Sequence, residues 1–205
     1  MMVSSFIWCS QLVARQECWV SEETGEEPTT ISQATMRKGS VAPQATVTTA
    51  KTFDFPVDWN GDRVTKVNPN GYRLKIDGDV SSPVELTLEE LYSMPNVQRT
   101  LKIRCENGWT ADVPWEGITL SYLLSQAGAS LKSIANARVE SITGYSRTVS
   151  SDEIADPDNI IALKAGGAPL TVEHGYPARL VLPARFGFDW VKYVARITCA
   201  NKQHD

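Results

Sequence analysis

A short alternating run that ends in a cysteine constrains this chain more than any other feature of its sequence. Leu101, Ile103 and Cys105 alternate with polar residues, which predicts a strand with one apolar face. Directly after Cys105 the composition changes to Glu, Asn, Gly and Trp, and with Pro114 further on we expect a loop rather than another strand. A thiol at a strand end, facing such a loop, is placed to bind a soft metal or to act as a nucleophile.

Cys105 also has a plainer interpretation. A lone cysteine in an apolar strand is often a small buried hydrophobic residue rather than a reactive group. Neither a His nor another Cys stands near it in the sequence, which argues against a zinc cluster. The local pattern therefore indicates a site without identifying its chemistry.

Composition favours one globular domain with a core. Of the 205 residues, 42% are hydrophobic and 21% are charged. The net charge of -4 disfavours a nucleic-acid partner. No run of about 18 apolar residues is present, so we expect no membrane-spanning helix. The chain has no CxxC pair, and we expect its cysteines to be reduced rather than to form disulfides; they are Cys9, Cys18, Cys105 and Cys199.

The first part of the chain has the composition of a tail. Residues 21–49 are rich in Glu, Thr, Ser, Gln and Pro and carry almost no periodic apolar residues, so they cannot bury enough surface to offset chain entropy. We expect residues 1–50 to be an N-terminal tail and residues 51–205 to form the domain. No twin-arginine signal is visible, which favours the cytoplasm; the periplasm or extracellular space is the alternative if the N-terminus is a clipped export signal.

Within the domain, the pattern predicts many short strands and a few short helices. Strands are expected up to Asp77, at residues 137–142, 160–163, 170–172, 179–182 and 193–197, with a hairpin connection over residues 164–169. Thr87 with Glu90 forms a capping box for one helix, Thr119 caps a second, and Ser150 or Ser151 caps a third. The apolar stripe of the second helix is expected to be core. These elements predict a mixed α+β domain whose loops gather at one side.

Two stretches together resemble a known family. The sequence RCENGWTADVPWEGITL, residues 104–120, resembles the molybdenum-ligand loop of the sulfite oxidase family of molybdopterin-dependent oxidoreductases. The sequence HGYPARLVLPARFGFDWVK, residues 174–192, is similar to that family's second cofactor loop. The similarity runs from about Phe53 to Ile197 with the same order of elements. The resemblance implies a sulfite oxidase-like fold with a mixed sheet, a molybdopterin cofactor with molybdenum, and an oxidoreductase.

The resemblance also implies roles for single residues. It makes Cys105 the thiolate ligand of molybdenum, which agrees with the preference of a soft thiolate for a sulfur-rich metal centre. The loop around Tyr145 corresponds to a pterin-contacting loop. Trp109 is expected to form a wall of the site and Trp115 to pack in the core, whereas Asp112 either bonds the pterin or caps the loop.

A second group of cofactor contacts comes from the later stretch. His174 and Arg179 match residues that contact the pterin and its phosphate, and Lys192 with Trp190 and Val191 matches the closing contact. Arg179 and Lys192 supply the fixed positive charge that a phosphate requires. The alternative is that both are ordinary surface charges.

The chain departs from the sulfite-oxidising members of the family in one segment. Alignment without gaps places Trp59, Asn60 and Gly61 where those members have an Arg-Asn-His type segment. Asn60 fits and is expected to contact the cofactor, but the arginine that would hold an anionic substrate has no counterpart unless Arg63 reaches in. An S-oxide such as methionine sulfoxide therefore competes with sulfite as the expected substrate, favoured by a rim of Trp59, Trp109 and Tyr145.

The resemblance also bears on partners. The sequence has no CxxCH haem motif, so we expect electrons to pass to a separate electron-transfer protein or haem subunit. It ends before the segment that carries the family's active-site tyrosine and dimerisation domain, so the usual dimer interface is expected to be missing. The alternative function is a molybdopterin-binding or electron-relay module that needs a partner to recognise substrate. A degenerate domain without cofactor is a weaker third possibility.

Overall fold

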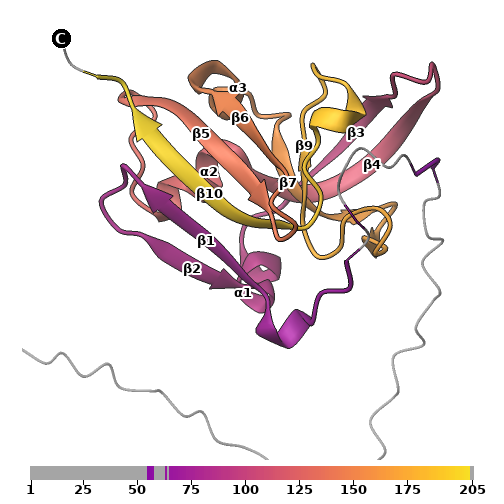
Figure 1. Cartoon of the computed structure of the whole chain (residues 1–205), viewed down its shortest axis with the longest axis horizontal. Coiled ribbons are helices and arrows are strands. Elements are labelled where there is room, and N and C mark those ends of the chain that lie inside the picture. The colour runs from indigo at the N-terminus through magenta and orange to yellow at the C-terminus, as the bar shows by residue number, and fades with distance from the viewer. Residues whose placement is uncertain (1–54, 58–62, 64, 204–205) are drawn as a thin grey trace, which may run out of the picture. The chain divides into compact units, whose positions relative to one another are not determined.

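The computed structural model describes residues 55–57, 63 and 65–203 (Figure 1). The expected tail, residues 1–50, lies outside these residues, so the boundary between tail and domain stays a prediction. Within the described part of the chain, strands and a few short helices build an α+β fold, as the sequence predicts.

The first sheet contains both the earliest and the latest strand of the described chain. Its order is β2-β1-β10-β5-β6, with β1 parallel to β10 and the other neighbours antiparallel. Gly78 lies opposite Cys199, and a Cβ on Gly78 would lie 2.2 Å from the Cys199 carbonyl oxygen, so this pairing requires glycine. The strands are β1 (Arg73–Gly78), β2 (Val84–Thr87), β5 (Ile134–Ser141), β6 (Ser146–Ser150) and β10 (Val194–Asn201).

The second sheet carries the strand that ends at Cys105. Its order is β3-β4-β7-β8, and β9 also pairs with β7; all of these pairings are antiparallel. The strands are β3 (Val97–Arg104), β4 (Thr110–Thr119), β7 (Ile160–Ala165), β8 (Ala168–Pro169) and β9 (Arg179–Val181). In β3, Leu101 and Ile103 are buried and their polar neighbours exposed, which confirms the predicted alternation.

The structure corrects the expectation of a long loop after Cys105. Only residues 105–109 connect the strands, and β4 begins at Thr110. Val113 and Trp115 alternate with exposed neighbours, a pattern that was present in the sequence but was outweighed by Pro114. Pro114 faces Thr100 of β3 and lies beyond the register with β7, which ends at Trp115, so β4 tolerates the missing N–H.

The predicted hairpin after β7 is present but shorter than expected. Gly166 and Gly167 have φ values of 62° and 81° and form its turn, and the returning strand is only Ala168–Pro169. The predicted strand at residues 170–172 is wrong, because these residues already enter a turn in which Thr171 accepts a hydrogen bond from the His174 N–H.

The helices begin where the sequence predicts. Capping boxes join Thr87 to Glu90 in α1 (Leu88–Ser93) and Ser150 to Glu153 in α3 (Ser151–Ala155). Thr119 caps α2 (Leu120–Gln126). Two single 3-10 turns, η1 (Pro69–Gly71) and η2 (Gly187–Asp189), complete these elements.

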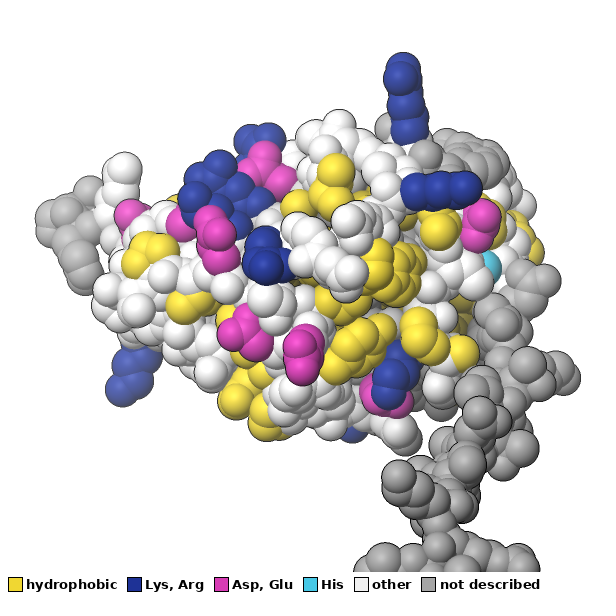
Figure 2. All heavy atoms as spheres, turned by 90° about the horizontal axis from the view of Figure 1, so that it is seen from below, with side chains coloured by type: hydrophobic (Ala, Val, Ile, Leu, Met, Phe, Trp, Pro, Cys, Tyr) yellow, Lys and Arg dark blue, Asp and Glu magenta, His cyan; other side chains and the backbone are white. Residues whose placement is uncertain are grey.

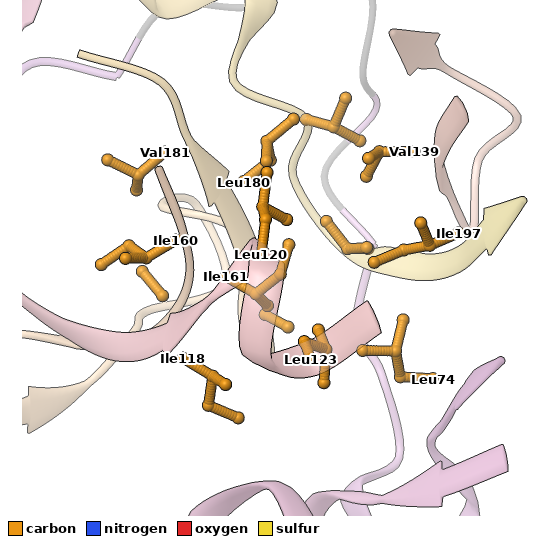
Figure 3. Close-up of a cluster of buried hydrophobic side chains, with 14 of the residues drawn as sticks. Leu74, Ile118, Leu120, Leu123, Val139, Ile160, Ile161, Leu180, Val181 and Ile197 are labelled. Carbon is orange, nitrogen blue, oxygen red and sulfur yellow. The ribbon is translucent and has the colours of Figure 1, made fainter. Parts of the chain in front are cut away.

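The core lies between the two sheets, with α2 inside it. Leu120 and Leu123 of α2 lie in one cluster with apolar side chains of both sheets, and each is at most 1% exposed (Figure 3). The predicted apolar stripe is therefore core. Burial of one such side chain stabilises the fold by about 1.5–3 kcal/mol. The labelled partners are Leu74, Val139 and Ile197 of the first sheet and Ile118, Ile160, Ile161, Leu180 and Val181 of the second.

The face seen in Figure 2 mixes charges of both signs. Lys and Arg side chains alternate with Asp and Glu side chains around a group of apolar side chains near the middle of the face. None of the described helices is both long and apolar enough to span a bilayer.

Candidate cofactor and active site

A pocket of about 210 Å³ brings together four residues that the sequence singled out. Cys105, His174, Arg179 and Lys192 all line it, although they come from three separate segments of the chain. The remaining lining residues are Phe55, Pro56, Val57, Ile103, Glu106, Asn107, Trp109, Gly187 and Phe188.

Cys105 lies in a tight turn between β3 and β4. Its N–H donates to the Trp109 carbonyl (3.0 Å), and the Gly108 N–H donates to the Cys105 carbonyl (3.0 Å). Gly108 has a φ of 89°, which fits a hairpin turn that ends in a left-handed residue. The Asn107 N–H lies 3.4 Å from Cys105 Sγ and donates to it. The turn therefore holds a half-buried, reduced thiol at the pocket.

His174 is buried and uses both ring nitrogens inside the protein. Nε2 lies 3.0 Å from the Phe55 carbonyl oxygen, and Nδ1 lies 2.8 Å from the Thr171 hydroxyl. A carbonyl oxygen can only accept, so in the neutral ring Nε2 carries the hydrogen and Nδ1 accepts from Thr171. The ring also packs on Phe55, with the centroids 4.1 Å apart. His174 thus fixes the segment around Phe55 as a wall of the pocket.

Arg179 is a buried cation surrounded by aromatic rings. It begins β9 and is 3% exposed, and its Nη1 donates to the His174 carbonyl (3.2 Å). The guanidinium carbon lies 5.9 Å from the ring centre of Phe55 and 5.8 Å from those of Trp115 and Trp190. These rings restrict the orientation of the guanidinium plane, and therefore the direction in which its N–H groups can donate to a ligand.

Lys192 is also buried, at 3% exposure, and the backbone around it is closely packed. A Cβ on Gly175 would lie 3.0 Å from the Lys192 Cβ, and Gly175 has a φ of 102°, so only glycine fits this approach. The next residue, Tyr193, has a φ of 52°, which is unusual for an aromatic side chain. The Tyr193 hydroxyl donates to the Val172 carbonyl (2.7 Å) and holds this conformation.

Trp190 and Val191 lie behind the pocket rather than in its lining. Trp190 is fully buried, donates from Nε1 to the Leu182 carbonyl (2.8 Å) and packs on Trp115. The Val191 carbonyl accepts from the Leu180 N–H (2.8 Å). Both residues thus position Arg179 and Lys192, and their direct contact with a cofactor stays a prediction.

Tyr145 acts through the loop of residues 183–190, which we call the clamp loop. The Tyr145 hydroxyl donates to the carbonyl of Phe188, whose side chain lines the pocket. Tyr145 itself is not among the described lining residues. Arg147 lies over the Tyr145 ring at 4.4 Å and pairs with Asp189 at 2.6 Å. The predicted pterin contact of Tyr145 stays a prediction.

Two further arginines fasten the clamp loop. Arg185 makes two hydrogen bonds of 2.6 Å to Glu153 of α3, and Arg104 donates to the carbonyls of Pro183 (2.9 Å) and Ala184 (3.1 Å). Burial raises the pKa of Glu153, but the hydrogen bonds from Arg185 and from Ser150 outweigh it, and the net pKa lies below its usual range. The loop is therefore fixed to both sheets.

Other predicted residues have clear positions. Trp109 lines the pocket as expected, and Trp115 is 1% exposed in the core. Asp112 pairs with Lys102 across the β3–β4 hairpin at 2.7 Å, so it neither caps the loop nor lines the pocket. Asn60 and Trp59 lie outside the described residues, and the role of Asn60 stays a prediction.

Phe55, Gly187 and Phe188 are among the lining residues that sequence reasoning missed. Phe55 follows no recognisable pattern, and its place depends on His174, far along the chain. Phe188 and Gly187 lie in the clamp loop, where the sequence Phe-Gly-Phe at residues 186–188 was the available signal. A Cβ on Gly187 would lie 3.1 Å from side-chain carbons of Ile103, so glycine lets the loop approach β3.

The donor set fits a thiol-bound, anionic cofactor better than a bare metal ion. No cluster of three or more His, Cys, Asp or Glu residues suitable for a metal occurs among the described residues. Instead the pocket offers one thiol, Cys105, together with two buried cations, Arg179 and Lys192. A single soft ligand suits a metal whose other sulfurs come from the cofactor, and the cations suit its phosphate.

Comparison with known proteins identifies the family. The MsrP catalytic subunit of Gluconobacter oxydans, named a protein-methionine-sulfoxide reductase, is 31% identical in an alignment of 147 residues that covers 63% of this chain and 47% of that protein. The YedZ1 protein of Azospira oryzae is 26% identical over 161 residues, 78% of this chain and 60% of YedZ1.

A solved structure agrees. The sulfane dehydrogenase SoxCD of Paracoccus pantotrophus matches 68% of this chain and 40% of its own chain, with a TM-score of 0.62 and 29% identity. This chain thus spans roughly half the length of these relatives. The oxidoreductase molybdopterin binding domain matches residues 61–205. The chain therefore belongs to this sulfite oxidase-like family, whose domain binds the molybdenum cofactor.

Proposed function

We propose that this chain is the molybdenum-cofactor domain of an enzyme that removes the oxygen atom from an uncharged S-oxide, with Cys105 as the protein ligand of the metal. The observation that carries the proposal is a single pocket in which the Cys105 thiol and two buried cations, Arg179 and Lys192, meet.

The cofactor and Cys105 have different roles in the proposed reaction. When bound, the molybdenum cofactor supplies the two-electron redox change and the site for the oxygen atom. Cys105 presents its sulfur from a turn with two backbone hydrogen bonds, and the Asn107 N–H donates to that sulfur at 3.4 Å. The fixed turn sets the position of the sulfur before anything binds, so little free energy is lost in ordering it.

The buried cations hold the anionic part of the cofactor. Arg179 is fixed by its bond to the His174 carbonyl and by three rings, and Lys192 is fixed by its packing on Gly175. Burial strengthens their attraction for a phosphate because water screens it less. These two positive charges therefore pair with the cofactor and not with the substrate.

The described mouth of the pocket favours an uncharged substrate. Trp109 and Phe188 supply aromatic surface, and Glu106, next to Cys105, adds a negative charge that opposes an anion such as sulfite. The reaction balances as R₂SO + 2 H⁺ + 2 e⁻ → R₂S + H₂O. The name of MsrP supports S-oxide reduction, and the name of SoxCD supports sulfur redox chemistry more generally.

The two electrons require a donor outside this chain. We propose a separate electron-transfer protein or haem subunit for this step, in the cytoplasm. A second candidate function is a cofactor-binding subunit that relies on a partner for substrate recognition. The name of the YedZ1 relative, which describes a protein-methionine-sulfoxide reductase subunit, favours it.

The test measures molybdenum and pterin in the full chain, purified from a host that makes the cofactor, beside the Cys105→Ala and Cys199→Ala variants. Cys199 is a buried thiol of the first sheet and serves as the control. We expect about one molybdenum per chain in the wild type, and reduction of methionine sulfoxide with an artificial electron donor that Cys105→Ala loses and Cys199→Ala keeps. Molybdenum without activity on any sulfur substrate supports the subunit function, and a folded wild type without molybdenum overturns both.

A further inference from the structure

A row of stacked rings and guanidinium groups runs along the clamp loop. Arg104 lies 5.9 Å over the ring of Phe186, which stacks on Phe188 at 6.3 Å with an angle of 16° between the rings. Arg147 lies 5.7 Å over Phe188 and 4.4 Å over Tyr145. Each neighbour restrains the next, so the row is a fixed structure rather than a set of independent side chains.

The row lies against the pocket at its middle residue, Phe188, and reaches the surface at Phe186. Phe188 lines the pocket, whereas Phe186 is 48% exposed. Arg104, directly before Cys105, holds the Phe186 end, and it also bonds the Pro183 and Ala184 carbonyls. The described residues contain three exposed large hydrophobic side chains, and of these Phe186 alone belongs to a segment that lines the pocket; the others are Leu131 and Ile142.

We propose that Phe186 is a specificity-determining residue that contacts an apolar side chain next to the S-oxide of a peptide substrate. The inference rests on the proposed function and adds a residue that discriminates among peptide substrates. An exposed aromatic ring that is already fixed loses little conformational entropy when it binds, so its contact area is converted efficiently into affinity.

The position of the ring favours a peptide over a small S-oxide. Phe186 is not among the residues that line the pocket, so a substrate as small as dimethyl sulfoxide, bound beside Cys105, does not extend to its ring. A methionine sulfoxide residue in a peptide leaves its neighbours outside the mouth. An apolar neighbour then covers the exposed ring of Phe186, which supplies the hydrophobic gain.

The experiment compares three S-oxides: the capped peptides Leu-Met(O)-Leu and Gly-Met(O)-Gly, and dimethyl sulfoxide. It uses the cofactor-loaded full chain as wild type, Phe186→Ala, Phe186→Tyr and the control Leu131→Ala, which removes an equally exposed side chain between α2 and β5. We expect Phe186→Ala to raise KM for the leucine peptide roughly tenfold with kcat nearly unchanged. Phe186→Tyr keeps the ring and should restore the wild-type KM, and dimethyl sulfoxide should not distinguish the variants.

A binding measurement separates this inference from the proposed reaction. The sulfone peptide Leu-Met(O₂)-Leu keeps the same side chains, and its Kd is measured by calorimetry with wild type and Phe186→Ala. Weaker binding by Phe186→Ala supports the role of the ring even if the wild type reduces no S-oxide, in which case only the reaction fails. Equal KM and equal Kd in wild type and Phe186→Ala overturn the inference, whatever the activity.

Discussion

The two sides of the pocket are built in opposite ways. On one side His174, Arg179 and Lys192 are each at most 5% exposed and are packed among rings and closely approaching backbone. On the other side Cys105 is half-buried in a turn, and a Cβ on Gly108 would have no atom within 4 Å. The buried side is part of the hydrophobic core, whereas the thiol side is a turn that packs less tightly.

This difference separates binding from chemistry. Under the proposed function, we expect a change on the buried side to alter packing, charge and cofactor retention together, because the same side chains contribute to all three. A change in the thiol turn has open space around it and leaves the fold nearly intact. The comparison predicts that stability and activity respond differently to equivalent substitutions on the two sides.

The largest expected effect comes from Arg179→Met. Removing a buried, hydrogen-bonded cation weakens the binding of the anion that it pairs with by about 4 kcal/mol. The affinity for molybdopterin should therefore fall roughly a thousandfold. Cofactor content after purification, by metal and pterin analysis, is the measurement. Arg138→Met is the control, because the Arg138 side chain is 57% exposed and does not line the pocket. Full retention of cofactor by Arg179→Met would show that the cation serves only the fold.

The sharpest test of the comparison is a pair of glycine substitutions. Gly175 and Gly108 have φ values of 102° and 89°, so alanine is strained at both. At Gly108 that strain is the whole cost, about 1 kcal/mol in the free energy of unfolding. At Gly175 the new Cβ also meets Lys192 at 3.0–3.2 Å, and we expect about 3 kcal/mol. Urea unfolding of the cofactor-free proteins measures both, and equal losses would remove the distinction between the two sides.

Tyr145→Phe tests how the clamp loop reaches the cofactor. The substitution removes the hydrogen bond to the Phe188 carbonyl and should lower the free energy of unfolding by about 1 kcal/mol. Because Tyr145 acts through Phe188 in this structure, pterin content should be unchanged while KM for S-oxides rises. A drop in pterin content instead supports the direct contact that the family resemblance implies.

Much of the fold follows from local patterns. The capping boxes at Thr87 and Ser150 and the stripe of α2 depend on residues close in sequence, so their physics is visible there. The strand β4 was missed because Pro114 was taken as a strand breaker, although Val113 and Trp115 carry the alternation. Whether a proline is tolerated depends on the partner strand, and that is set by tertiary structure.

The candidate site divides in the same manner. Cys105, Arg179 and Lys192 could be singled out because the family resemblance covers their segments. The aromatic cage of Arg179 could not, since Phe55, Trp115 and Trp190 come from three distant parts of the chain. Burial of these charges, which gives them their strength, is likewise a property of the folded chain and of no single segment.

The smallest expected effect concerns the clamp loop and its pH dependence. Glu153 has a folded pKa below its usual 4.5, so its bond with Arg185 stabilises the protein fully above pH 4.5, and this contribution is lost as the pH falls through the folded value. Glu153→Gln should therefore lower the free energy of unfolding by about 1 kcal/mol near pH 7, since the side chains are only 22–27% exposed, and by less near pH 3. A double-mutant cycle with Arg185→Gln at both pH values isolates the pair. A coupling energy that does not change with pH would show that the carboxylate charge has no part in holding the loop against α3.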